Sequence, residues 1–122
     1  KYEFWQKYHE MCLRCYACRN ICPACSCREC IFDSDKKKWV NKAALPADNA
    51  FFSVTRTMHV AGRCVECGEC ERVCPVGIPV MALNRSVIQE LYNLTMSYDA
   101  GIKLEMKPPL RQLKPISQTD GR

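Results

Sequence analysis

The sequence is dominated by the stretch CLRCYACRNICP, residues 12–23, in which four cysteines at a fixed spacing precede a proline. The same spacing returns in CVECGECERVCP, residues 64–75. The pattern Cys-x-x-Cys-x-x-Cys-x-x-x-Cys-Pro is the ligand spacing of a cubane 4Fe-4S cluster. The doubled pattern therefore predicts two such clusters.

Each predicted cluster is expected to take its fourth ligand from the other motif. Three cysteines at three-residue spacing can wrap one loop around a cluster, whereas the cysteine before the proline has left that loop and, in two-cluster chains, binds the other cluster. The proline favours an extended residue before it and a helix after it. The predicted ligand sets are Cys12, Cys15, Cys18 and Cys74 for cluster 1, and Cys64, Cys67, Cys70 and Cys22 for cluster 2.

Zinc and disulfides explain the cysteines less well. Zinc would be satisfied by two Cys-x-x-Cys pairs, which leaves the other cysteines and both prolines without a role. The 11 cysteines are an odd number, and the sequence shows no signal peptide, so a disulfide framework is disfavoured. Thiolate ligands at this density imply a reducing compartment, and we expect a cytoplasmic protein, either free or at the cytoplasmic face of a membrane complex.

Three further cysteines, Cys25, Cys27 and Cys30, follow the first motif directly. Eight ligands already satisfy two clusters, so one interpretation is a third metal site, either zinc or another iron–sulfur centre. The groups that could complete it are His9, His59, Asp33 or a residue of a partner. In a second interpretation, Cys25 or Cys27 replaces Cys22 as a ligand. In a third, the trio packs as small buried hydrophobic residues.

The charge balance gives no support for nucleic-acid binding. The formal net charge is +5, but two oxidised clusters of about −2 each would bring it to about +1. The basic residues are scattered and are not interleaved with the aromatic residues of a single-strand platform. No stretch is long and apolar enough to predict a membrane span.

Apolar residues at helical spacing predict three helices and a mainly α fold. The first leads into the first motif. The second is capped by Asp48 or Asn49 and stops near Gly62, directly before the second motif. The third and longest runs from Pro79 to about Tyr98. The expected apolar faces are Phe4, Trp5, Tyr8 and Met11; then Phe51, Val54, Met58 and Ala61; then Val80, Leu83, Val87, Leu91, Leu94 and Tyr98.

A change of composition near residue 101 divides the chain. Residues 1–101 are expected to form the dicluster iron–sulfur domain. Residues 102–122 contain two proline sites and no helical period, so we expect an extended tail that docks on a partner.

Other residues near the motifs could adjust the clusters. His9 and His59 lie on predicted helices beside the two motifs, where either could donate a hydrogen bond to a cluster sulfur. Gly68 leaves the second loop small, whereas the first loop has Tyr16 at the corresponding position. The two clusters are therefore expected to differ in reduction potential.

The segments RCYACRNICP, residues 14–23, and HVAGRCVECGECERVCP, residues 59–75, resemble the alpha-helical ferredoxin family over about residues 10–95. The resemblance implies a helical fold with two cluster-binding loops, as in iron–sulfur subunits of heterodisulfide reductases and succinate dehydrogenases. Similar dicluster segments occur with anaerobic formate dehydrogenases, hydrogenases and flavin-dependent NADH or deazaflavin oxidoreductases.

These features predict an electron relay with two 4Fe-4S clusters in a multi-subunit anaerobic oxidoreductase complex. Its expected partners are other subunits, among them a flavoprotein or nucleotide-binding module. The alternatives are a free ferredoxin-like carrier and a regulator or scaffold with structural clusters. No catalytic residue is expected, because the chain has neither a G-x-G-x-x-G loop nor a P-loop.

Overall fold

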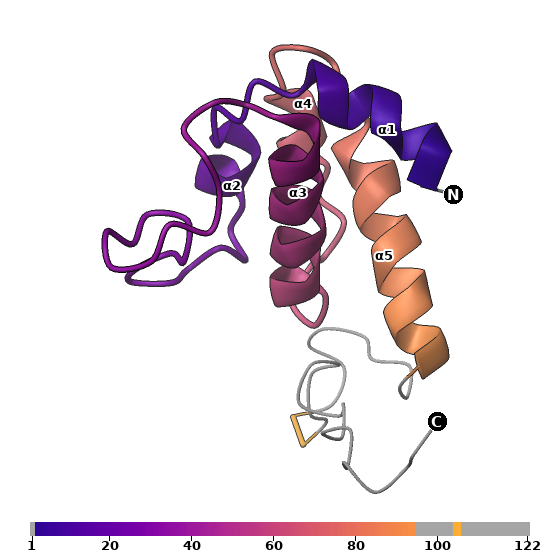
Figure 1. The fold of residues 1–122 in the computed structure, drawn as a ribbon. Coiled ribbons are helices and arrows are strands. Elements are labelled where there is room, and N and C mark those ends of the chain that lie inside the picture. Colours follow the sequence, from indigo (N-terminus) through magenta and orange to yellow (C-terminus); the bar gives the residue numbers. More distant parts are fainter. Residues whose placement is uncertain (1, 95–103, 106–122) are drawn as a thin grey trace, which may run out of the picture.

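The computed structural model describes residues 2–94 and 104–105 of the chain, and these residues form helices and loops with no strand (Figure 1). This confirms the mainly α prediction. The helices are α1 (Tyr2–Met11), α2 (Ala17–Ile21), α3 (Pro46–Val60), α4 (Glu69–Arg72) and α5 (Val80–Leu94).

The longer helices form a small scaffold around the cysteine motifs. Helices α3 and α5 lie side by side, and α1 lies across them near their N-terminal ends (Figure 1). The short helices α2 and α4 each follow one cysteine loop and contact each other. The two motifs, far apart in sequence, therefore come together at the centre of the fold.

Cysteines take part in the core of the protein. Its buried centre is Cys70, Ile78 and Val80. The half-buried side chains packed around this centre are Tyr8, Cys12, Cys18, Cys74, Val76 and Met81. Because thiols pack among these aliphatic side chains, the site and this part of the core overlap.

Helix α3 forms where expected, but its predicted apolar face is only partly right: Ala61 is buried and Met58 half-buried. The helix begins at Pro46 after the N-cap Leu45, so neither Asp48 nor Asn49 is the cap. Phe51 and Val54 are exposed. The buried residues are Asn49, Phe52, Arg56, Thr57 and Val60. This face lies against cysteine loops rich in backbone polar groups, which require polar partners.

The faces of α1 and α5 are partly as predicted. In α1, Phe4 and Met11 are exposed and His9 is buried instead. In α5, Val80, Leu83 and Leu91 are buried as expected, but Asn84 joins them and Leu94 is exposed. The predicted Tyr98 lies outside the described residues, as does the predicted tail except for residues 104–105. Among the described residues, no helix has the length and hydropathy to cross a membrane.

Candidate metal centres

The two cysteine loops have the same backbone shape. Arg14 and Tyr16 in the first loop have φ values of 47° and 61°, and Glu66 and Gly68 at the matching positions of the second have 59° and 76°. Left-handed residues turn the chain sharply, and a residue other than glycine adopts this conformation at a cost of about 1–2 kcal/mol. Such strain, repeated at the same positions, is typical of loops that clamp a ligand.

The first cavity is lined by the four cysteines predicted to hold cluster 1: Cys12, Cys15, Cys18 and Cys74. The rest of its wall is mainly aromatic and aliphatic, with Tyr8, Tyr16, Phe52, Ile78, Val80 and Leu83 among the lining residues. Burial raises the pKa of Cys18 to about 11 and also raises the pKa of Cys12. Cys12 and Cys18 are therefore partly desolvated in this cavity, whereas Cys15 is exposed.

The second cavity is lined by the four cysteines predicted to hold cluster 2: Cys22, Cys64, Cys67 and Cys70. Burial raises the pKa of Cys70, although the nearby Arg56 acts to lower it. Arg63 also lies on the wall. At Gly68, an added Cβ would meet no atom within 4 Å. The second loop thus has free space at the position where the first loop has Tyr16, which lines the first cavity.

Two polar side chains form a wall shared by both cavities, Arg56 of α3 and Asn84 of α5. Arg56 is 4% exposed. Its Nη2 donates to the backbone oxygen of Cys18 (3.2 Å), and its Nη1 donates to Asn84 Oδ1 (3.4 Å). Asn84 Nδ2 lies 3.8 Å from Cys70 Sγ, so this pair touches both loops.

Arg56 is a buried cation among thiols. Its Nε has no hydrogen-bond partner, and no carboxylate in the described residues pairs with it. Burial acts to lower the pKa of Arg56, but the neighbouring thiols of Cys18, Cys25 and Cys22 raise it above its usual value. An unpaired buried charge is costly, and anionic clusters beside it would supply the missing countercharge.

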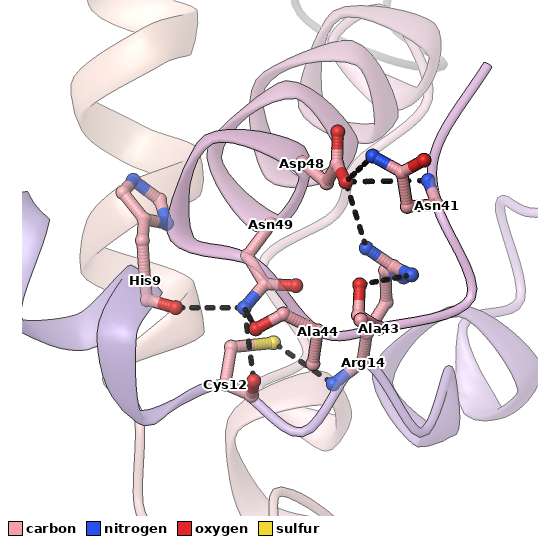
Figure 2. A network of polar contacts seen from close by, with 8 residues as sticks. All are labelled: His9, Cys12, Arg14, Asn41, Ala43, Ala44, Asp48 and Asn49. Atoms are coloured by element: carbon pink, nitrogen blue, oxygen red, sulfur yellow. Dashed lines mark hydrogen bonds and ion pairs between the residues drawn. The ribbon is translucent and has the colours of Figure 1, made fainter.

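A second buried amide, Asn49 of α3, fixes the start of the first loop. Figure 2 shows its Nδ2 donating to the backbone oxygens of His9 (2.8 Å), Cys12 (2.9 Å) and Ala44 (3.4 Å). Asn49 is fully buried. The side chain thereby joins the end of α1, the first cysteine loop and the connector before α3.

Arg14 completes this network on the other side (Figure 2). Its Nη2 donates to the backbone oxygen of Ala43 (2.9 Å), and its Nη1 lies 4.0 Å from Asp48 Oδ2. The backbone N–H of Arg14 donates to Cys12 Sγ (3.3 Å). Backbone N–H groups directed at cysteine sulfur stabilise a thiolate, and in iron–sulfur proteins such bonds raise the reduction potential.

The residues of both cavities fit an iron–sulfur cluster. Each cavity presents four thiols, the soft sulfur donors that iron–sulfur clusters use. The buried thiols have raised pKa values, so metal binding must displace their protons. The chain also matches the family of 4Fe-4S dicluster domains over residues 8–78.

The chain belongs to the 4Fe-4S dicluster domain family. It therefore carries two 4Fe-4S clusters, as the doubled motif predicts. The family match spans both loops and helices α2 to α4.

Two curated proteins resemble this dicluster domain over most of its length. "F420-dependent formate dehydrogenase subunit beta" of Methanocaldococcus jannaschii is 32% identical over 106 residues, which is 87% of this chain and 27% of that protein. "F420-dependent formate dehydrogenase 1 subunit beta" of Methanococcus maripaludis is 39% identical over 108 residues, or 88% of this chain and 27% of that protein. The chain thus spans about a quarter of these relatives. No solved structure matches it.

Cys27 and Cys30 lie apart from both cluster cavities, whereas the Cys25 side chain is hydrogen-bonded to that of Cys22, a predicted ligand of cluster 2. Cys25, Cys27 and Cys30 line a third cavity together with His59. Cys22, and neither Cys25 nor Cys27, lines the second cavity, and Cys25 N–H donates to Cys22 O (3.2 Å). Among the residues placed in the structure, no group of three His, Cys, Asp or Glu side chains could hold a single metal ion. The third metal site stays a prediction.

The two predicted tuning histidines have different surroundings. His9 is 4% exposed and lines the first cavity, and burial lowers its pKa, which leaves the imidazole neutral at pH 7. His59 is exposed and lines only the third cavity, so it is not beside either cluster cavity.

Sequence reasoning missed Arg56, Asn84 and Asn49, the polar residues that join the loops to the helices. Asn49 was predicted only as a helix cap, and no role was predicted for Arg56 or Asn84, although each lies on a helix at a spacing that is typical of burial. A buried stripe of Asn49, Phe52, Arg56 and Val60 was the available signal, since it keeps helical spacing directly ahead of a cysteine motif.

Proposed function

We propose that this chain is an electron relay within a larger oxidoreductase related to the beta subunits of F420-dependent formate dehydrogenases. In that assembly it would carry electrons between a site that uses F420 and a site that oxidises formate. The observation that carries this is the pair of four-cysteine cavities sharing one wall, Arg56 and Asn84. A bound 4Fe-4S cluster supplies a one-electron couple without chemical change at the protein.

The ligand sets are part of this proposal. Cys12, Cys15, Cys18 and Cys74 would hold cluster 1, and Cys22, Cys64, Cys67 and Cys70 would hold cluster 2. The separation of the cysteines into two cavities along these lines supports the exchange of the fourth ligand between motifs. The exchange ties the two loops together and keeps the two centres close.

Arg56 would balance charge for both centres. Each added electron increases the negative charge in a poorly solvated region, and a fixed buried cation on the shared wall makes that addition more favourable. Asn84 holds the guanidinium through its Oδ1 and reaches Cys70 with its amide nitrogen, so the cation cannot swing away from either cavity.

The apolar wall of the first cavity would protect its centre from water. Tyr16 packs edge-on against Phe52 with ring centroids 5.0 Å apart, and the Arg19 guanidinium lies 4.4 Å from the centroid of the Tyr16 ring. These contacts fix the Tyr16 ring on the wall of the first cavity. Less water lowers the stability of the more highly charged reduced state.

The expected domain bounds, tail and partners of this chain follow from its proposed place in a multi-subunit complex. Residues 1–101 would form the relay domain and residues 102–122 would extend to a partner, in a cytoplasmic complex with a flavoprotein or nucleotide-binding module. Exposed apolar side chains on the described surface suit such contacts: Phe4, Leu13, Trp39, Val65 and Leu94. Gel filtration of a native extract tests this, because a free carrier would elute alone at the mass of its own polypeptide and a relay would elute with other chains.

The relay is tested by rapid-freeze electron paramagnetic resonance (EPR) of the native complex, isolated without oxygen. After formate is added in the absence of F420, both clusters should be reduced at least as fast as the complex turns over. Addition of oxidised F420 should then reoxidise them at a comparable rate. Clusters that stay oxidised, or that change much more slowly than turnover, would exclude the relay and favour a structural role.

A further inference from the structure

The third cavity has no role in the dicluster function. It has a volume of about 260 Å³ and lies beside the connector that follows the first motif. Cys25, Cys27 and Cys30 line it, and none of the three lines either of the other cysteine cavities. A cavity of about 10–15 Å³ on the same measure holds one water, so this space exceeds what a single ion needs.

The cavity wall is strongly cationic. Four arginines and one carboxylate line it: Arg19, Arg28, Arg56, Arg63 and Asp33. Within the described part of the chain, Asp33 pairs with Arg19 at 2.9 Å, and none of the other three arginines pairs with a carboxylate. Arg56 is buried and its Nε has no partner. The natural occupant is therefore an anion.

The thiols identify which kind of anion. Three cysteines beside one imidazole, His59, form a metal-binding set rather than an oxyanion site. A zinc ion needs its sulfurs about 2.3 Å from one point, and no three ligating side chains of the described residues could hold a single ion. In the described residues, the four cysteines of each dicluster cavity are likewise not grouped around a single point, because a cubane binds each thiolate at a different iron.

We propose that this cavity binds a third iron–sulfur cluster, with Cys25, Cys27 and Cys30 as thiolate ligands and His59 at the fourth position. Histidine replaces cysteine as a ligand in other iron–sulfur centres. A cluster with thiolate ligands is anionic and would neutralise the unpaired arginines, Arg56 among them. Because Arg56 also lines both dicluster cavities, the third cluster would adjoin the other two.

Metal and sulfide content of the whole chain, purified without oxygen and reconstituted with iron and sulfide, tests this. The expected content is about 12 irons and no zinc per chain. The double variant Cys27→Ser/Cys30→Ser should lose about four irons and keep the two clusters of the motifs. Ser26→Ala, between the first two of the three cysteines, is the matched control and should keep the full content.

A wild-type chain with about eight irons would overturn the third cluster, and so would eight irons with one zinc. An unchanged iron content in the double variant would overturn the assignment of its ligands. Should the double variant not accumulate, the wild-type count and its Mössbauer spectrum decide alone. The two-cluster relay is unaffected by either result, because none of its proposed ligands is altered.

Discussion

The two cysteine loops share a backbone and differ in their surroundings. Both place left-handed residues at matching positions and continue into a short helix. The first carries Arg14 and Tyr16 and is held by Asn49, whereas the second carries Glu66 and Gly68 and meets Asn84 through Cys70. The repeat fixes which cofactor is bound, and the side chains around it make the two sites unequal.

The two cluster sites are expected to differ in their access to water and in the charges beside them. Tyr16 and Phe52 pack together on the wall of the first site, whereas the second loop has Gly68, with no side chain, at the position of Tyr16. Glu66 in the second loop pairs with Arg85 at 3.2 Å, and both side chains are well exposed, so this pair changes the potential little. We therefore expect hydration, rather than this ion pair, to make the larger contribution to the difference between the two reduction potentials.

The largest effect tests which loop each fourth ligand serves. We expect Cys74→Ser to remove the cluster of the first loop and Cys22→Ser to remove that of the second, each with a loss of about four irons. The EPR signal left in Cys74→Ser should match that of Cys18→Ser. A signal that matches Cys70→Ser instead would show that each motif binds its own cluster.

The next largest effect concerns the hydrogen bonds by which Asn49 holds the first loop. Asn49→Ala leaves three backbone oxygens without their buried donor, which should destabilise the protein by about 2 kcal/mol. This corresponds to a fall of roughly 10 °C in the melting temperature of a domain of this size. Thermal bleaching of the visible cluster absorbance measures it.

The control for Asn49→Ala is Asn41→Ala, which removes an exposed amide from the same network. Its effect should stay within about 0.5 kcal/mol. Equal melting temperatures for the Asn41 and Asn49 variants would show that Asn49 does not support the loop.

A change at the shared wall should act on both sites. We expect Arg56→Gln to lower the reduction potentials of both clusters, because the variant removes a buried cation near each. A tenfold change in the one-electron equilibrium is about 59 mV, and we expect a shift of this order. A redox titration followed by EPR measures it.

Two comparisons separate charge from packing in this experiment. Arg56→Lys keeps the charge and should recover most of the potential. Arg72→Gln removes an exposed arginine paired with Glu69 and should change neither potential. A shift in only one cluster, or no recovery with lysine, would contradict a shared electrostatic role.

The smallest expected effect sharpens the contrast between the loops. Tyr16→Gly gives the first loop the residue that the second loop has at Gly68. The variant relieves the strain of the left-handed backbone at this position, and we expect it to let water reach the first site. The potential of the first cluster should rise by less than the Arg56 shift, while that of the second stays constant. A fall in the first potential, or equal shifts in both, would refute hydration as the cause.

The two clusters and the positions of the longer helices could be predicted from the sequence, because both depend on local spacing. The doubled motif predicted two clusters, and the helical periods located α1, α3 and α5 to within a few residues of their observed bounds. The exchange of Cys22 and Cys74 between the motifs stays a prediction, which the lining of the two cavities supports.

The sequence failed where burial is decided by the site. Phe51 was expected in the core, but it is exposed, while Phe52, Arg56 and Asn49 are buried. Ordinary amphipathic reasoning assumes an apolar interior. Here the interior holds thiols and loop carbonyls, so an arginine and an amide are more favourable than an aliphatic side chain.

The inequality of the two sites is tested most directly by a redox titration of the whole wild-type chain, monitored by EPR. The structure predicts two separate one-electron midpoints, with the lower one belonging to the site covered by Tyr16. Assignment follows from the signal that persists in Cys70→Ser. A single midpoint shared by both clusters would contradict it.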